Sequence, residues 1–144
     1  MENNDIQEIA KKKRYLKRYR KNKACVNRLE EKLYLLEERI TTVRTSSLSG
    51  MPRGGVVVTI DDLISDKEDL EDRIKRLKRK GKAIRSEILE EIDSLDDPRY
   101  CEILEAYFID GLSMERIADN IAYTPRHVYR LYEKAVSMLT IKRQ

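Results

Sequence analysis

Residues 111–135 read GLSMERIADNIAYTPRHVYRLYEKA and contain start signals for two short helices in close succession. The hydroxyl of Ser113 is suited to cap the first helix, because it can accept a hydrogen bond from an unpaired amide of the first turn. Thr124 and Pro125 begin the second helix, since threonine also caps and proline at the first helical position loses no hydrogen bond. Two helices joined by so few residues predict a helix-turn-helix.

Both predicted helices carry an apolar stripe, with apolar residues recurring at the spacing of one helix face. These residues are Ile117, Ala118 and Ile121 in the first helix and Val128, Leu131 and Ala135 in the second. The turn between them contains Ala122, at a position where glycine is usual. If this residue has a positive φ, alanine costs about 1 kcal/mol relative to glycine. The turn is then slightly reshaped, or Tyr123 braces it.

The start of the second helix carries the side chains expected to face outward, Arg126, His127, Tyr129 and Arg130. In helix-turn-helix proteins this end enters the DNA major groove, and the arginine fork matches O6 and N7 of guanine together. We therefore predict that Arg126, His127 and Arg130 read bases. Contacts to the DNA backbone are predicted for Ser113, Thr124, Tyr129, Lys134 and Lys142. The alternative is a small helical hairpin with a solvated basic face.

A third helix is predicted directly before this pair. Asp97 is its expected N-cap, Pro98 its first residue and Gly111 its end. Three packed helices of about 45 residues are a small but feasible domain. The residues expected in its core are Cys101, Leu104, Tyr107, Phe108, Ile117, Ile121, Val128, Leu131 and Leu139.

The chain before this domain has a coiled-coil pattern, with apolar residues in alternating steps of three and four. They are Tyr19, Val26, Leu29, Leu33, Leu36, Ile40 and Val43, then Ile60, Leu63, Leu70, Ile74, Leu77, Ile84 and Ile88. Asn22, Lys67 and Gly81 also fall on this seam. Turn-forming composition at about 45–59 separates the two runs. The pattern predicts an antiparallel hairpin, although pairing with a second copy of the chain fits it as well.

The predicted fold is therefore all-α. A long antiparallel helical hairpin occupies residues 1–95, and a trihelical helix-turn-helix domain occupies residues 96–144.

Positive charge is concentrated in two stretches of the hairpin. Residues 11–29 hold ten Lys and Arg and no acid, and residues 75–82 hold six and no acid. Such runs suit DNA phosphates, whose neutralisation releases counterions. Backbone contacts are predicted for Lys12, Lys13, Arg14, Lys17, Arg18 and Lys21, while Tyr15 and Tyr19 could bond to phosphate or stack. The alternative is a solvated helix surface, and the acidic stretch 61–72 leaves docking of a basic partner open.

Composition argues against several other classes of protein. Charged residues make up 39% of the 144 residues and aromatic residues 6%, which fits exposed long helices. The absence of a membrane-spanning apolar run or an apolar signal core predicts a cytoplasmic protein with no membrane partner. Cys25 and Cys101 are too few and too distant for a zinc cluster or a disulfide framework. One histidine, no phosphate-binding glycine loop and no spaced metal ligands predict no enzyme, cofactor, metal or small-molecule substrate.

Several segments carry a resemblance to known families. Residues 99–104, 109–113, 117–118 and 124–131 resemble region 4 of bacterial sigma factors, which reads an upstream promoter element. The whole chain is similar to phage late-gene regulators of Gram-positive hosts, described as ArpU-type or RinA-like. The shared features are the linker Ser49–Gly55, the segment Asp96–Tyr100 and the final helix-turn-helix. The resemblance implies that Arg126, His127 and Arg130 fall where sigma-like proteins contact bases.

These observations together predict a sequence-specific DNA-binding transcriptional regulator. Its predicted partner is double-stranded DNA in the bacterial nucleoid. RNA polymerase and a second copy of the chain, paired through the hairpin, are the other partners considered. Two other classes stay open: a DNA-packaging subunit like the phage small terminase, which would form a ring, and a coiled-coil adaptor whose C-terminal domain binds protein.

Overall fold

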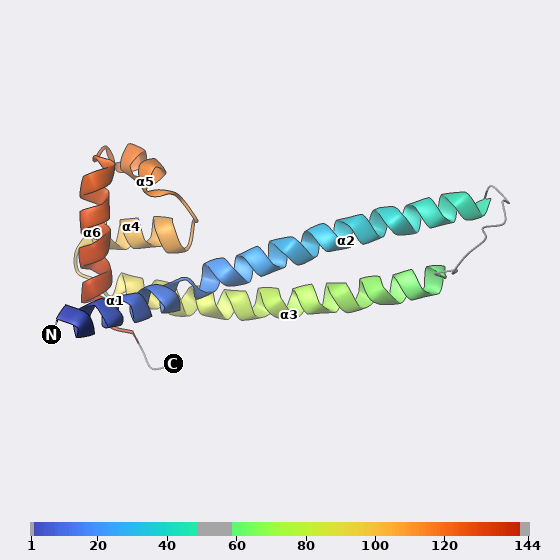
Figure 1. Ribbon diagram of the computed structural model, residues 1–144, viewed down its shortest axis with the longest axis horizontal. Coiled ribbons are helices and arrows are strands. Elements are labelled where there is room, and N and C mark those ends of the chain that lie inside the picture. The colour runs from blue at the N-terminus through green and yellow to red at the C-terminus, as the bar shows by residue number, and fades with distance from the viewer. Residues whose placement is uncertain (1, 49–58, 142–144) are drawn as a thin grey trace. The chain divides into compact units, whose positions relative to one another are not determined.

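The computed structural model describes residues 2–48 and 59–141 of the chain. This described part contains six α-helices and no strand, so the predicted all-α class is confirmed (Figure 1). The helices are α1 (Glu2–Leu16), α2 (Arg18–Leu48), α3 (Ile60–Asp93), α4 (Pro98–Phe108), α5 (Met114–Ile121) and α6 (Pro125–Met138). The linker Ser49–Gly55 and Lys142 lie outside the described residues.

The chain divides into two compact units that do not follow the predicted boundary at residue 95. The first unit combines residues 1–21 with residues 81–144, and the second consists of residues 22–80. The first unit therefore contains α1, the first residues of α2 and the C-terminal end of α3 in addition to α4, α5 and α6. The predicted boundary falls inside this unit, because apolar residues of α1 and α3 complete its core.

The core of the first unit contains the predicted trihelical residues and a further set that was not predicted there. Leu104, Phe108, Ile117, Val128 and Leu139 are all at most 1% exposed. Cys101, Tyr107 and Ile121 pack against this core while partly buried. The added buried residues are Tyr15 and Leu16 from α1 and Ile84, Ile88 and Ile92 from α3.

Two sequence-based expectations are corrected by this core. Ile84 and Ile88 were predicted on the hairpin seam, but they are buried with the C-terminal helices. Tyr15 was considered as a side chain that could bond to DNA phosphate or stack, but it is 1% exposed. Burying a large apolar side chain contributes about 1.5–3 kcal/mol, so Leu16 and Ile88 attach their helices firmly to this unit.

The start and end of α4 follow the predicted signals. The carboxylate of Asp97 accepts a hydrogen bond from the backbone N–H of Arg99 at 2.9 Å, and Pro98 is the first helical residue. The Arg99 side chain also pairs with Asp97 at 2.9 Å, and these bonds lower the pKa of the Asp97 carboxyl. Gly111 follows the helix with a φ of +72°, a conformation that favours glycine.

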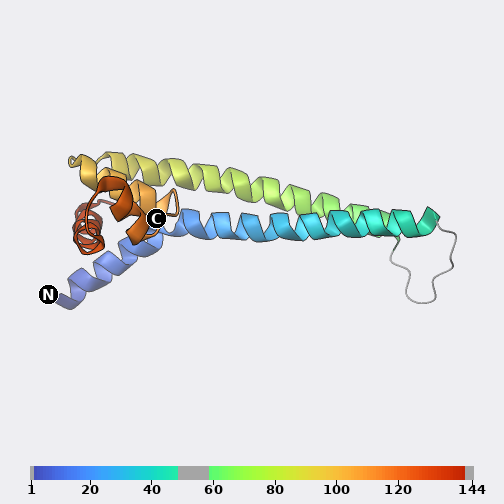
Figure 2. The same cartoon turned by 90° about the horizontal axis from the view of Figure 1, so that it is seen from above.

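The second unit consists of parts of α2 and α3 that run antiparallel, side by side in both views (Figures 1 and 2). Val26, Leu29 and Ile74 are buried between them. The Asn22 side chain donates to the carbonyl of Leu77 at 3.0 Å, so this polar seam residue has a partner on the other helix. Ion pairs join Lys78 to Glu30 at 2.7 Å and Lys67 to Glu37 at 3.8 Å. In the structure these two segments thus pair within one chain.

Candidate nucleic-acid interface

The helices α5 and α6 begin with the two predicted caps. The Ser113 hydroxyl accepts from the backbone N–H of Arg116 at 3.2 Å. The Thr124 hydroxyl accepts from the backbone N–H of His127 at 3.2 Å, and Pro125 is the first residue of α6. Both caps are confirmed. They fix the residue at which each helix starts, and therefore determine which side chains of the first turn point outward.

The turn between α5 and α6 adopts the conformation considered for Ala122. This residue has φ 58° and ψ 39°, in the left-handed region that disfavours any residue with a Cβ. The next backbone N–H, of Tyr123, donates to the carbonyl of Ala118 at 3.0 Å. The Tyr123 ring lies edge-on to the His127 ring, with centroids 4.9 Å apart. Tyr123 therefore braces the start of α6. This was one of the two outcomes expected for the turn.

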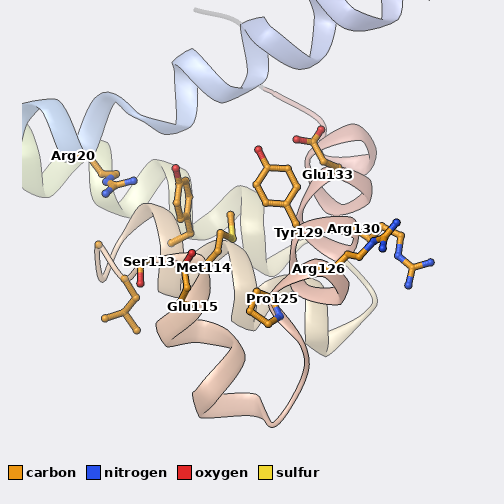
Figure 3. Close-up of a pocket in the computed structure, with 12 residues that line it drawn as sticks. Arg20, Ser113, Met114, Glu115, Pro125, Arg126, Tyr129, Arg130 and Glu133 are labelled. Carbon is orange, nitrogen blue, oxygen red and sulfur yellow. The ribbon is translucent and has the colours of Figure 1, made fainter.

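Arg126 and Arg130 are exposed on α6, one helical turn apart. Residues at this spacing lie on the same face of a helix. Figure 3 shows both guanidinium groups pointing away from the body of the unit. Within the described residues neither makes a hydrogen bond or an ion pair. His127 is half-buried against Tyr123, so it is less available to a ligand than the two arginines.

The buried face of α6 holds these arginines in place. Val128, Ala135 and Val136 are 0% exposed, and Tyr132 is 3% exposed. Tyr132 also contacts the rings of Tyr107 at 5.1 Å and Phe108 at 5.8 Å. The backbone of α6 is therefore fixed by packing, while its outer face remains open.

An open pocket of about 830 Å³ lies beside α6. Its lining comes from four helices and includes Arg20 from α2, Tyr107 from α4, Ser113 and Met114 at the start of α5, and Tyr129 from α6 (Figure 3). Tyr129 is 52% exposed, which leaves its ring and hydroxyl accessible from this side. Ser113 and Tyr129, both predicted to contact the DNA backbone, thus lie on one pocket.

The helix α1 is attached to α6 through two of the predicted phosphate-binding lysines. The Lys12 ammonium donates to the carbonyl of Ser137 at 2.9 Å. The Lys13 ammonium pairs with the carboxylate of Glu133 at 2.6 Å and lies 5.3 Å from the centroid of the Tyr132 ring. Both cations therefore have protein partners in this structure.

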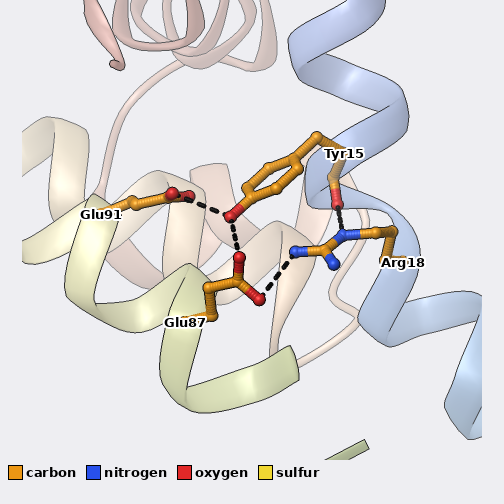
Figure 4. A network of polar contacts seen from close by, with 4 residues as sticks. All are labelled: Tyr15, Arg18, Glu87 and Glu91. Atoms are coloured by element: carbon orange, nitrogen blue, oxygen red, sulfur yellow. Dashed lines mark hydrogen bonds and ion pairs between the residues drawn. The ribbon is translucent and has the colours of Figure 1, made fainter. Parts of the chain in front are cut away.

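Arg18 belongs to a network of polar contacts around Tyr15 (Figure 4). The Tyr15 hydroxyl lies 2.7 Å from a Glu87 oxygen and 2.8 Å from a Glu91 oxygen, and it is the donor. Arg18 pairs with Glu87 at 3.2 Å and stacks over the Tyr15 ring at 4.0 Å. Burial, and then the bonds to the two carboxylates, raise the pKa of the Tyr15 phenol far above its usual value. This network joins α1, α2 and α3 within the first unit.

The other predicted backbone contacts differ in accessibility. Arg14, Lys21, Thr124 and Lys134 are exposed, and Lys17 is half-buried. Lys142 lies outside the described residues. These exposed cations are the ones that can meet a phosphate without first breaking a contact.

Sequence reasoning did not single out Arg20, although it belongs to the basic stretch 11–29. Its guanidinium lies over the Tyr107 ring, with Cζ 4.7 Å from the centroid. Nothing in a run of ten cations distinguishes the one that stacks on an aromatic ring more than eighty residues later. The spacing of the apolar residues Tyr15, Leu16 and Tyr19 was the one available signal that part of the stretch 11–29 packs against a hydrophobic core.

No family model, curated protein or solved structure matches this chain. Among the described helices, none combines the length and the apolar character needed to cross a lipid bilayer. Within residues 2–48 and 59–141, no group of three or more His, Cys, Asp or Glu side chains is placed to hold a metal ion.

Proposed function

We propose that this protein is a sequence-specific DNA-binding transcriptional regulator that places α6 in the major groove. The observation that carries the proposal is the pair Arg126 and Arg130, exposed on one face of a helix whose opposite face is fully buried. Neither guanidinium has a partner within the described residues. A rigid helix with two solvent-exposed arginine forks suits recognition of guanine edges.

The residues around α6 suit the flanking phosphates. The N-termini of α5 and α6 present Ser113 and Thr124, and helix N-termini favour anions. Lys134 lies one turn beyond Arg130 and is exposed. In this proposal the two arginines and His127 select sequence, while Ser113, Thr124, Tyr129 and Lys134 set the orientation of α6 on the duplex.

The resemblance of residues 99–104, 109–113, 117–118 and 124–131 to sigma region 4, and of nearly the full chain to phage late-gene regulators, supports the proposed role in transcription. By this proposal the protein acts in the bacterial cytoplasm on the nucleoid. RNA polymerase is the protein partner that the resemblance supplies.

Selection of binding sites from a random duplex library tests the proposal. The wild type is compared with Arg126→Ala/Arg130→Ala at near-physiological salt, since salt sets the non-specific background. A motif that emerges with the wild type and disappears with the double variant supports the proposal. Binding without a motif, or no binding, contradicts it and favours a packaging role or a protein partner, respectively.

A further inference from the structure

Arg20 presents a positive charge that is held in one place. Its guanidinium is stacked on the Tyr107 ring at 4.7 Å, an arrangement that leaves the charge and the N–H donors intact. The ring is itself fixed, because it lies edge-on to Phe108 at 4.9 Å and to Tyr132 at 5.1 Å. A positioned guanidinium loses less conformational entropy on binding an anion than a mobile one does.

Arg20 lines the open pocket beside α6, and the exposed arginines Arg126 and Arg130 belong to the lining of the same pocket. Figure 3 shows Arg20 across the pocket from Tyr129, with the guanidinium groups of Arg126 and Arg130 directed away from it. Two carboxylates also line this pocket, those of Glu115 and Glu133. The Glu133 charge is compensated by Lys13 at 2.6 Å. The carboxylate of Glu133 therefore repels an anion next to Arg20 less than an uncompensated carboxylate on α6 would.

The shape of DNA determines which group can reach this position. The major groove is about 12 Å wide and is bordered by phosphates on both sides, so a helix inside it has a phosphate row along each flank. Arg20 lies on one flank of α6. A phosphodiester oxygen pair fits a guanidinium fork, and the apolar side chains of Leu112 and Met114 in the same lining suit a deoxyribose ring.

We propose that Arg20, held on Tyr107, binds one phosphodiester of the DNA backbone beside the bases that α6 reads. The inference rests on the proposed function. It adds a contact from the N-terminal part of the chain to the interface of the helix-turn-helix. Arg20 acts in it as a positioning residue, because it fixes the register of α6 on the duplex and carries no sequence information itself.

The test measures dissociation constants at several salt concentrations for a duplex with the selected motif and for a scrambled duplex of equal length. The variants are Arg20→Ala, Arg20→Gln, which keeps a long stem over the Tyr107 ring, and the control Arg28→Ala. Arg28 is an exposed arginine further along α2, in the second unit. Loss of one phosphate contact should lower the slope of log K against log salt by about 0.9 and weaken both duplexes alike, by about tenfold.

A second measurement locates the phosphate and does not depend on the stability of a variant. Single phosphates of the motif duplex are replaced by neutral methylphosphonates, one per duplex. Replacement at one position should weaken DNA binding by the wild type about tenfold. The same replacement should leave binding by Arg20→Gln unaffected, because that variant already lacks the contact. Unchanged slopes in both Arg20 variants, or no phosphate coupled to Arg20, would overturn the inference. If the wild type selects no motif, the proposed function fails separately, and the slope on random duplex still decides whether Arg20 meets a phosphate.

Discussion

The ammonium of Lys13 lies 2.6 Å from a carboxylate oxygen of Glu133 and so joins α1 to α6 across 120 residues of sequence. Glu133 lies one helical turn after Arg130, on the helix proposed to enter DNA. An unpaired carboxylate there would repel phosphate and compete for Arg130. The basic residues of α1 therefore support α6 from within the protein, in addition to any contact with DNA by exposed residues such as Arg14.

Removing the Lys13 charge should weaken DNA binding indirectly, through Glu133. Lys13→Ala exposes the carboxylate, so binding to motif and scrambled duplexes should fall by up to about 1 kcal/mol, the range of a partly exposed ion pair. Lys13→Ala/Glu133→Gln should recover most of this loss. A double-mutant cycle on the dissociation constants measures the coupling. Strictly additive effects would show that Lys13 acts on DNA by itself.

Tyr15→Phe should destabilise the first unit. The phenol donates to both Glu87 and Glu91, and Glu91 is 3% exposed, so its oxygen loses a partner that water cannot easily replace. A cost of about 1–3 kcal/mol is expected in the free energy of unfolding. Urea denaturation measures it, with Tyr19→Phe as the control because Tyr19 is half-buried outside this network. Equal losses in the two variants would contradict the role given to the Tyr15 hydroxyl.

The same hydroxyl should make stability depend on alkaline pH. Burial and the two carboxylates raise the pKa of Tyr15, so folding favours the neutral phenol. This contribution is fully present below the unfolded pKa of about 10 and is lost as the pH rises above it. Burial raises the pKa of Tyr132 in the same direction, so Tyr15→Phe should reduce the alkaline loss without abolishing it. Unfolding free energies measured between neutral and alkaline pH test this, and identical curves for variant and wild type would refute it.

Ala122→Gly should stabilise the protein. Ala122 has a φ of 58°, which strains alanine but not glycine, and the gain expected is about 1 kcal/mol. Ala118→Gly is a useful comparison, because Ala118 is a buried helical residue where glycine should cost about 1 kcal/mol. Thermal unfolding of both variants measures the two changes in stability, which should have opposite signs. A destabilised Ala122→Gly protein would mean that the Ala122 side chain makes contacts that outweigh the strain.

The local features of the C-terminal part could be predicted from the sequence. Ser113, Thr124 and Asp97 cap their helices as expected, because a cap is decided by residues only two or three positions apart. A positive φ at Ala122 was also considered from the sequence, because a turn conformation likewise depends on residues close together in the chain. The exposure of Arg126 and Arg130 followed from the apolar stripe on the other face of α6.

The packing of α1 and the end of α3 could not be predicted in this way. Ile84 and Ile88 continue the spacing of the hairpin seam, and periodicity does not tell which partner covers an apolar face. Tyr15 and Leu16 lie in the stretch 11–29, which holds ten Lys and Arg, so this stretch was interpreted as a phosphate-binding surface. Their burial depends on contacts with α3 and with the C-terminal helices, at long range in the sequence. The stacking of Arg20 on Tyr107 is of the same kind.

The central claim is that the two arginines of α6 read bases while neighbouring cations hold the backbone. The most direct measurement is the ratio of affinities for the selected motif and a scrambled duplex, in the wild type, Arg126→Ala/Arg130→Ala and Lys134→Ala. We predict that the arginine variant loses most of this ratio, by about 1–3 kcal/mol for each base contact. Lys134→Ala should keep the ratio, weaken both duplexes and lower the salt slope by about 1. An unchanged ratio in the arginine variant would contradict the account.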